Sequence, residues 1–243
     1  MIKNFQPLPS TSIEHIVVLS GAGISAESGL STFRDSGGLW EGFDINEVAS
    51  IEGWYRNREK VLDFYNIRRK QAADVEPNLA HKALADLENE YQVTVITQNV
   101  DDLHERGGSS NVIHLHGKLR EARSEEDPDV IVDIGEKAIS IGDTAPDGTQ
   151  LRPNVVWFGE PVPMVSIAAE KVSSADLFIV VGTSLAVYPA AGLTDYTQPR
   201  TEKYLVDPGT PELYSYDGWH HIQESAATGV PKLTKKLLNR DYE

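Results

Sequence analysis

The stretch that decides the fold is Ile16-Val17-Val18-Leu19-Ser20-Gly21-Ala22-Gly23-Ile24-Ser25-Ala26, a short apolar run that ends in a glycine turn. Such a run is typical of a strand buried on both faces of a parallel sheet. Gly21, Gly23 and the small Ala26 fit the G-x-G-x-x-G/A turn, whose glycines let the backbone approach a pyrophosphate. The helix expected next would offer its N–H groups and positive dipole end to that anion. Taken alone, the turn fits an ordinary strand-to-helix connection equally well.

Three more apolar runs of the same kind follow along the chain, at 93–96, 177–181 and 204–206, and each lies just before a loop rich in Gly, Asn, Asp or Ser. Apolar residues at helical spacing predict helices over about 59–73, from Pro77-Asn78 onward, and over 167–172. Strands alternating with helices predict an α/β fold with a Rossmann-type, doubly wound parallel sheet. In such a sheet the ligand binds at the carboxyl ends of the strands.

Two stretches depart from this alternation. Residues 36–90 are mostly helical in pattern with no clear strand, and residues 118–153 are polar and acidic. We interpret both as insertions that form a second, smaller lobe. Residues 1–35, 91–117 and 154–243 then form the larger domain.

The amino-acid composition limits the kinds of partner that we expect this protein to bind. The 243 residues include 22 Lys and Arg against 37 Asp and Glu, a net charge of −15. This charge opposes binding to nucleic acid or to anionic membranes. No apolar run approaches the length of about 20 residues that a membrane helix needs, and the first residues lack the apolar core of a signal peptide. We therefore expect a cytoplasmic protein.

Polar side chains follow the second predicted strand. Gln98, Asn99 and Asp101 are placed to hold ribose hydroxyls and a carboxamide at the carboxyl end of that strand. A dehydrogenase would also need an acid about 20 residues beyond the glycine turn, at the end of a second strand. Glu41 has the spacing but follows Gly37-Gly38-Leu39-Trp40, which is no strand pattern. A hydride-transfer enzyme is therefore disfavoured.

Two histidines, His114 and His116, would share one face if their segment is a strand. A zinc pair is conceivable, but the sequence offers only His104 as an obvious third ligand. We favour one histidine as a general base near neutral pH and the other as a structural residue.

Six motifs carry a specific resemblance. They occur together, in order, and resemble the sirtuin family from about residue 13 to 238. The motifs are Gly21-Ala22-Gly23-Ile24-Ser25, Thr32-Phe33-Arg34-Asp35, Gln98-Asn99-Val100-Asp101, His116-Gly117, Val155-Val156-Trp157-Phe158-Gly159-Glu160 and Gly182-Thr183-Ser184.

The resemblance implies NAD as co-substrate and acylated lysines of proteins or peptides as substrates. It implies His116 as the base, with Asn99 and Asp101 as further catalytic residues, and O-acyl-ADP-ribose and nicotinamide as products. It also implies that Val156, Trp157, Phe158 and Gly159 pair with the substrate backbone as an added strand. The cofactor-binding residues that it implies are Gly21, Ala22, Gly23, Ser25, Ala26, Phe33, Arg34, Asp35, Trp40, Gln98, Asn99, Asp101, Gly182, Thr183 and Ser184.

The sequence departs from the family at two places. Most relatives carry two Cys pairs that bind a structural zinc after the His-Gly motif, whereas this chain has no cysteine. We therefore expect no zinc, with residues 118–153 either folding by their own packing or partly disordered. At the adenosine end, Val206-Asp207-Pro208 stands where relatives often have Asn and Glu. Asp207 as a ribose contact and Ala226 as an adenine contact are assigned by analogy.

Tyr65 and Arg68 are the residues from which we predict the kind of acyl group that is removed. Residues three apart share a helix face, which by itself fits a surface Tyr–Arg pair. The pair also resembles the Tyr-x-x-Arg of sirtuins that remove succinyl and malonyl groups, where Arg pairs with the acyl carboxylate. We predict a preference for these acidic acyl groups and leave acetyl open. The alternative functions are an ADP-ribosyltransferase or NAD glycohydrolase on the same scaffold, or an NAD-binding protein without activity.

Overall fold

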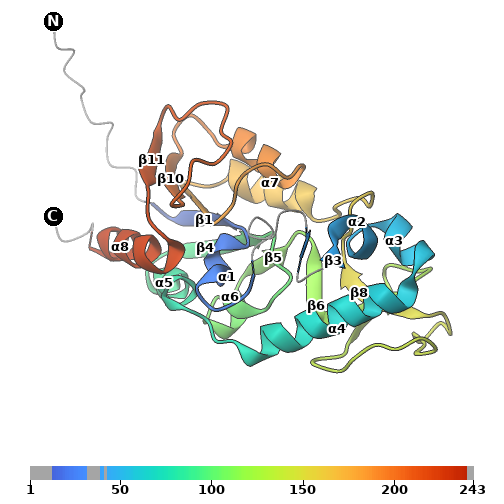
Figure 1. The fold of residues 1–243 in the computed structure, drawn as a ribbon. Coiled ribbons are helices and arrows are strands. Elements are labelled where there is room, and N and C mark those ends of the chain that lie inside the picture. Colours follow the sequence, from blue (N-terminus) through green and yellow to red (C-terminus); the bar gives the residue numbers. More distant parts are fainter. Residues whose placement is uncertain (1–12, 32–38, 41–42, 240–243) are drawn as a thin grey trace, which may run out of the picture.

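A computed structural model describes residues 13–31, 39–40 and 43–239. Its centre is a six-stranded sheet in the order β11-β10-β9-β1-β4-β5, with every neighbouring pair parallel (Figure 1). If only the six strands of this sheet are numbered 1 to 6 along the chain, their order read from β5 is 3-2-1-4-5-6. This arrangement is typical of dinucleotide-binding sheets. The strands are β1 (His15–Ser20), β4 (Gln92–Thr97), β5 (Val112–His114), β9 (Leu177–Val181), β10 (Glu202–Val206) and β11 (Trp219–Ile222).

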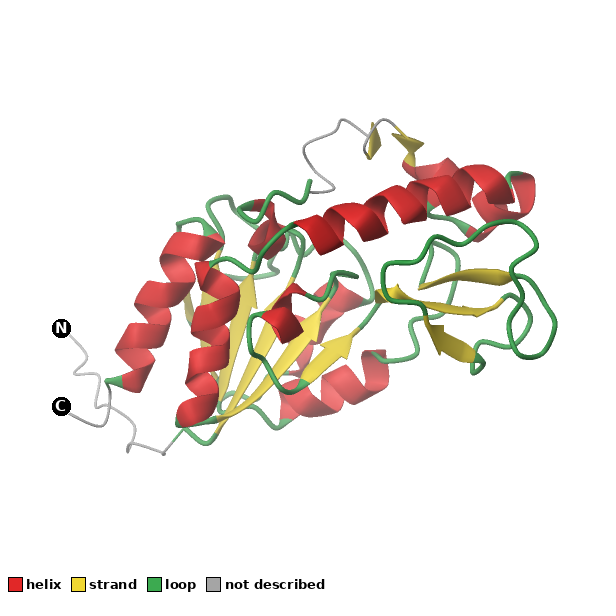
Figure 2. Ribbon diagram, turned by 90° about the horizontal axis from the view of Figure 1, so that it is seen from below, coloured by secondary structure: helices red, strands yellow, loops and turns green. Residues whose placement is uncertain are grey.

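Helices cover both faces of this sheet (Figure 2). Ile16 and Val18 of β1 pack with α5 (Leu79–Asp86) and α8 (Ala226–Leu238). The alternate residues Val17 and Leu19 pack with α7 (Val165–Ser173) and the 3-10 helix η2 (Ala190–Tyr196) on the other face. These four side chains of β1 are fully buried, which explains why residues 16–19 form a continuous apolar run. Three helices are short. Helix α1 (Gly23–Ala26) follows β1, α6 (Leu103–Arg106) follows β4, and the 3-10 helix η1 (Leu87–Asn89) directly follows α5.

A second lobe lies beyond the β5 end of the sheet (Figure 1). It has its own hydrophobic core, in which Trp54 and Phe64 meet Leu119, Ala122 and Trp157. Its antiparallel sheet has the order β7-β6-β8. The elements of this lobe are α2 (Ile45–Val48), α3 (Ile51–Arg56), α4 (Arg58–Asp74), β6 (Gly117–Ser124), β7 (Ile131–Asp133), β8 (Leu151–Val155) and the two-stranded β2 (Leu39–Trp40) and β3 (Phe43–Asp44).

The predicted α/β fold with a doubly wound parallel sheet and a smaller lobe is confirmed. The expectation of no strand within 36–90 is wrong in one detail, because β2 and β3 pair there as a short antiparallel hairpin. Residues 118–153 form β6, β7 and part of β8, and their core residues Leu119, Ala122 and Ile139 pack against α4. This region therefore folds by its own packing.

Helix α5 marks where the two lobes divide. We predicted that residues up to 90 belong to the small lobe, but Ala80, Ala83 and Leu84 lie in the core of the parallel sheet beside Val93 and α8. We therefore propose that the first insertion ends near the end of α4, before α5 begins. Within the described part of the chain, no helix is long and apolar enough to span a membrane.

Candidate active site

Two glycine turns meet where the strand order reverses, between β1 and β9. The Gly21 N–H donates to the Val181 carbonyl at 3.0 Å, and the Gly23 N–H donates to the Gly182 carbonyl at 2.8 Å. A Cβ on Gly23 would lie 2.7 Å from the Gly182 Cα, and Gly182 itself has a φ of +61°. The turns can therefore approach this closely only because both carry glycine.

A hydrogen-bonded chain of side chains joins the first turn to the loop after β4. The Asn99 side chain donates to the Gly21 carbonyl at 3.2 Å and to Ser25 Oγ at 3.1 Å. Ser25 Oγ in turn donates to Asp101 Oδ2 at 3.2 Å. The structure thus brings together Ser25, Asn99 and Asp101, three of the residues that the resemblance implies as cofactor-binding.

Asp101 is almost entirely buried. Burial raises the pKa of the Asp101 carboxyl, while hydrogen bonds from the Leu103 N–H and the Ser25 hydroxyl act to lower it. The positive charge of Arg68 also acts to lower it. The carboxyl is thus held by a fixed set of donors in a site with little water.

His116 lies directly beside this loop. Its Nδ1 is 2.9 Å from the Gln98 carbonyl oxygen, which can only accept a hydrogen bond. Nδ1 therefore carries the hydrogen, and the neutral ring keeps its lone pair on Nε2. Burial lowers the pKa of His116, partly offset by the hydrogen bond to Gln98. The ring is thus suited to accept a proton at neutral pH.

His114 has a different role from His116. Its Nδ1 lies 3.0 Å from the Asn99 carbonyl oxygen, and its Nε2 lies 2.8 Å from Glu105 Oε1. Burial alone would raise the pKa of Glu105, but the hydrogen bond and charge of His114 outweigh it and bring the pKa to about 2. Both nitrogens of His114 are thus engaged, so it holds the Asn99 loop in place. No group of three metal-ligating side chains occurs within the described ranges.

The predicted adenosine contacts lie at the ends of β9 and β10. The Gln98 side chain donates to Thr183 Oγ1 at 3.0 Å, and the Ser184 carbonyl accepts from the Glu212 N–H. Asp207 is buried, and its Oδ1 accepts from the Gly209 N–H at 2.8 Å. Ala226 begins α8, and its side chain packs in the core of the sheet. A cofactor contact from Ala226 would therefore use its backbone.

The predicted substrate strand runs from Val156 to Gly159. The N–H groups of Val156 and Phe158 donate to the carbonyls of His116 and Ala49. The Trp157 N–H donates to Glu160 Oε2 at 2.8 Å. Of this stretch, the Gly159 N–H has no acceptor within the described residues, and the side chain of Phe158 is exposed. Pairing with a substrate remains a prediction.

Tyr65 and Arg68 lie on the buried face of α4, with exposed fractions of 2% and 6%. This burial excludes the alternative of a surface Tyr–Arg pair. Burial raises the pKa of Tyr65, and the charge of Arg68 acts against that rise, as it does for Asp101. Arg68 is therefore within electrostatic reach of both the tyrosine and the site carboxyl.

Four of the predicted cofactor-binding residues have no described side chain. Phe33, Arg34 and Asp35 lie outside the described residues, and only the backbone of Trp40, in β2, is described. Ala22 and Ala26 flank or end α1, next to the glycine turn.

The sequence reasoning missed a buried polar chain beneath the site. Ser20 Oγ donates to Thr97 Oγ1 at 2.9 Å and lies 2.8 Å from His104 Nε2. It also missed Arg152, which pairs with Glu160 at 2.7 Å behind the predicted substrate strand. Ser20 directly follows the apolar run of β1, and Arg152 lies just before the motif at 155–160. A polar residue at such a position was the signal that could have pointed to these contacts.

A parallel sheet whose glycine turns meet at the reversal of strand order defines a nucleotide-binding α/β protein. Here amide, carboxylate and imidazole groups also surround that point. The chain belongs to the Sir2 family, whose pattern matches residues 21–189.

Individual relatives agree with this assignment. An NAD-dependent protein deacylase of Helicobacter pylori is 53% identical over 93% of this chain and 98% of its own. A solved Sir2 homologue in complex with NAD superposes with a TM-score of 0.84 at 37% identity, covering 93% of this chain and 90% of that one. A Sir2 mutant solved with a p53 peptide and NAD has a TM-score of 0.74 at 28% identity, covering 95% and 94%.

Proposed function

We propose that this enzyme removes succinyl and malonyl groups from protein lysines, with NAD as co-substrate, and that Tyr65 and Arg68 select these acidic acyl groups. The class of the enzyme, an NAD-dependent protein deacylase, follows from its membership of the Sir2 family and its close relatives.

The residues at the strand ends fit NAD. The Ala22 N–H, in the glycine turn, has no acceptor in the described part of the chain and can donate to a phosphate oxygen. Gln98, Asn99 and Asp101 together provide the donors and acceptors that ribose hydroxyls and a carboxamide require. When bound, NAD would supply a ribose carbon for attack by the acyl oxygen, nicotinamide as the leaving group and a ribose hydroxyl as the final acceptor of the acyl group.

His116 is the proposed general base. Its Nε2 lone pair would take a proton from a ribose hydroxyl, while the Gln98 carbonyl holds Nδ1–H in place. Asn99 and Asp101 are proposed to orient the ribose and the nicotinamide amide, since Ser25 and the Leu103 N–H fix their side chains.

The observation that carries the acyl assignment is the burial of Arg68 beside both Tyr65 and Asp101. A guanidinium keeps its positive charge even when it is buried. It can bind the carboxylate of a succinyl or malonyl group bidentately, where little water competes for the hydrogen bonds. An acetyl group has no charge to offer and would gain nothing from Arg68.

The test is a comparison of succinyl-lysine and acetyl-lysine versions of one peptide. Arg68→Met keeps most of the side-chain volume and removes the charge. We expect the ratio of kcat/KM for the two peptides to fall about 10- to 100-fold, as expected for the loss of charged hydrogen bonds. Product analysis by mass spectrometry should show O-succinyl-ADP-ribose for the native enzyme.

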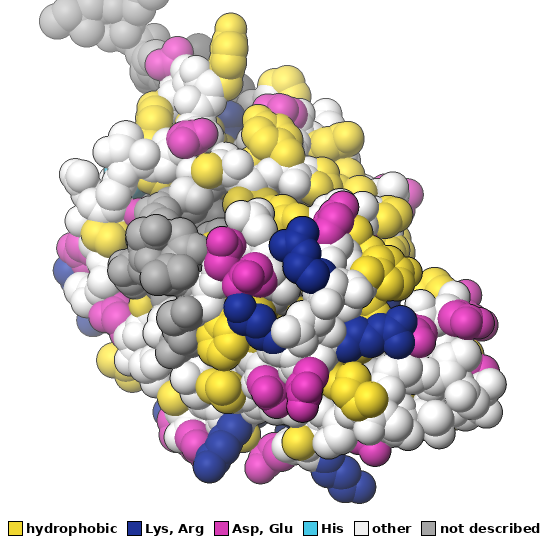
Figure 3. Space-filling view, turned by 45° about the vertical axis from the view of Figure 1, so that its right-hand side comes forward, with side chains coloured by type: hydrophobic (Ala, Val, Ile, Leu, Met, Phe, Trp, Pro, Cys, Tyr) yellow, Lys and Arg dark blue, Asp and Glu magenta, His cyan; other side chains and the backbone are white. Residues whose placement is uncertain are grey.

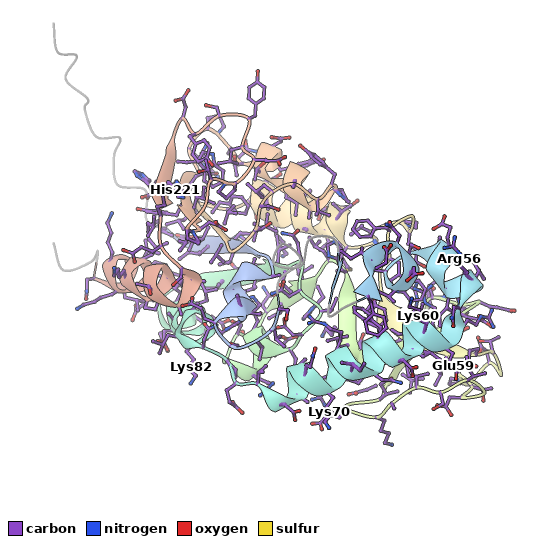
Figure 4. All side chains as sticks on the ribbon, in the orientation of Figure 1. Arg56, Glu59, Lys60, Lys70, Lys82 and His221 are labelled. Atoms are coloured by element: carbon purple, nitrogen blue, oxygen red, sulfur yellow. The ribbon has the colours of Figure 1, made fainter. Side chains whose placement is uncertain are left out.

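Lys70→Met is the matched control. It makes the same change of charge on the same helix, but Lys70 is exposed on the outer side of α4 (Figure 4). The ratio should stay within about twofold in this variant. Equal losses on both peptides in Arg68→Met would contradict the acyl assignment. Release of nicotinamide with neither acyl group removed would instead favour the glycohydrolase or transferase.

A further inference from the structure

A single hydrogen bond links the proposed acyl-reading residue to the predicted substrate strand. The indole Nε1–H of Trp157 donates to the Tyr65 hydroxyl oxygen at 2.9 Å. Each of the two side chains is only 2% exposed, and their ring centroids are 6.1 Å apart. The bond is therefore shielded from water, which strengthens it and makes its loss costly.

The direction of this bond is fixed by chemistry. An indole N–H can only donate, so the Tyr65 oxygen is the acceptor. The hydroxyl hydrogen of Tyr65 must then point away from Trp157. No acceptor for that hydrogen lies within hydrogen-bond distance among the described residues. The hydrogen is thus directed to a partner that this part of the chain does not provide.

Trp157 is held from several sides. Its backbone N–H donates to Glu160 Oε2 at 2.8 Å, and the Arg152 Cζ lies 3.4 Å from the centroid of its ring. Arg152 also pairs with Glu160 through two nitrogens, at 2.7 and 3.0 Å. Trp54 packs beside the indole, with ring centroids 5.5 Å apart. The indole N–H therefore has little freedom to turn away from Tyr65.

The phenol keeps its proton in this setting. Burial raises the pKa of Tyr65, and the hydrogen bond from Trp157 only partly offsets that rise. Tyr65 therefore remains a donor at neutral pH. Arg68, one helical turn along α4, provides a positive charge near the same oxygen. A donor and a cation close together form a receptor for a carboxylate.

We propose that Trp157 is a positioning residue for acyl selectivity: its indole N–H occupies the Tyr65 oxygen and so directs the Tyr65 hydroxyl hydrogen toward the acyl carboxylate. This inference rests on the proposed desuccinylase and demalonylase function and adds a residue to it. It assigns to the Trp157 side chain a role separate from the predicted backbone pairing of its segment.

The experiment is a double-mutant cycle of Trp157→Phe and Tyr65→Phe, read as the ratio of kcat/KM for succinyl-lysine and acetyl-lysine peptides. Phenylalanine keeps an aromatic face for Arg152 and removes the N–H. Any effect on main-chain contacts is common to both peptides and cancels in the ratio. We expect Trp157→Phe to lower the ratio about fivefold, the effect of one lost hydrogen bond. In the Tyr65→Phe background it should change the ratio by less than about twofold.

A closer substitute is available if Trp157→Phe unfolds. Benzothienylalanine at position 157 preserves the shape of the indole and lacks the N–H, and its thermal unfolding can be compared directly with the native chain. The same fivefold fall is expected.

An unchanged ratio in Trp157→Phe or with benzothienylalanine would overturn the inference, as would effects that simply multiply in the double mutant. If Arg68→Met still lowered the ratio, the proposed function would stand without Trp157. If Arg68→Met lowered both activities equally, the proposed function would fail and the inference with it.

Discussion

His116 shows how one hydrogen bond and the degree of burial set the behaviour of a single residue. The Gln98 carbonyl fixes the hydrogen on Nδ1, and burial lowers the pKa of the ring. A base works only while it is neutral, so activity should fall as the pH drops through the His116 pKa. Because that pKa lies below the ordinary 6.5 of histidine, we expect the acidic limb of kcat/KM against pH to have its midpoint below 6.5.

The same residue allows a direct substitution test. His116→Ala should lower turnover at least about 100-fold, the lower end of what general-base catalysis contributes. O-acyl-ADP-ribose, measured by mass spectrometry, is the readout. Turnover close to that of the native enzyme would show that His116 is not the base. Thermal unfolding of the variant provides the control for folding.

Single residues were predictable from the sequence to different degrees. Gln98, Asn99 and Asp101 lie beside the glycine turn because they directly follow a buried strand, and strand ends converge in a parallel sheet. Their roles toward NAD remain predictions. The Trp157–Tyr65 bond could not be predicted, since the two residues are 92 positions apart and neither shows its hydrogen-bond partner in the pattern. Contacts of this kind, between segments far apart in the chain, depend on packing rather than on local signals.

Among the elements, the two glycine turns make a close contact that can be tested. A Cβ on Gly182 would lie 2.3 Å from the Ile24 backbone nitrogen, and the φ of +61° is unfavourable for other residues. We expect Gly182→Ala to lower the free energy of unfolding by about 2 kcal/mol or more and to raise KM for NAD. Denaturant unfolding and steady-state kinetics with varied NAD measure the two effects.

Gly192→Ala is the matched comparison for that variant. Its added Cβ would meet Tyr188 at an ordinary 3.5 Å, and Gly192 does not have a positive φ. It should therefore change the free energy of unfolding by no more than about 0.5 kcal/mol. Equal losses in the two variants would argue against a special role for the contact between the turns.

The helices and strands also differ in how well their sequence patterns predict them. Strands β1, β4, β9 and β10 were predicted because burial on both faces gives uninterrupted apolar runs. The hairpin of β2 and β3 was not, since two residues per strand carry no periodicity. The helix of α5 was predicted, but its apolar face would suit either lobe. Its position in the core of the parallel sheet became clear only from the packing with α8.

At the level of the whole molecule, the acidic residues outnumber the basic ones and give a net charge of −15. On the face shown in Figure 3, Lys and Arg side chains lie among Asp and Glu. Charge of this kind gives solubility and little directed attraction. Acylated proteins as substrates follow from the deacylase class of the enzyme. The absence of nucleic-acid and membrane partners and the cytoplasmic location remain predictions from the sequence.

The small lobe is held together in a chain that has no cysteine. A structural zinc site needs four ligands, usually Cys and His, and the described ranges hold no group of even three candidate ligands. Packing of Trp54, Phe64 and Trp157 provides a core instead. Glu160 adds partly buried ion pairs to Arg123 and Arg152, at 3.0 and 2.7 Å.

Both features are independent of metal, so a zinc chelator such as 1,10-phenanthroline should leave Tm and deacylase activity unchanged. Metal analysis of the purified protein should likewise find far less than one zinc per chain. A zinc-dependent protein that unfolds under the same treatment serves as the control. Stoichiometric zinc, or a fall in Tm on chelation, would mean that His and carboxylate ligands hold a metal, and the small lobe would then owe its stability to that site rather than to its packed core.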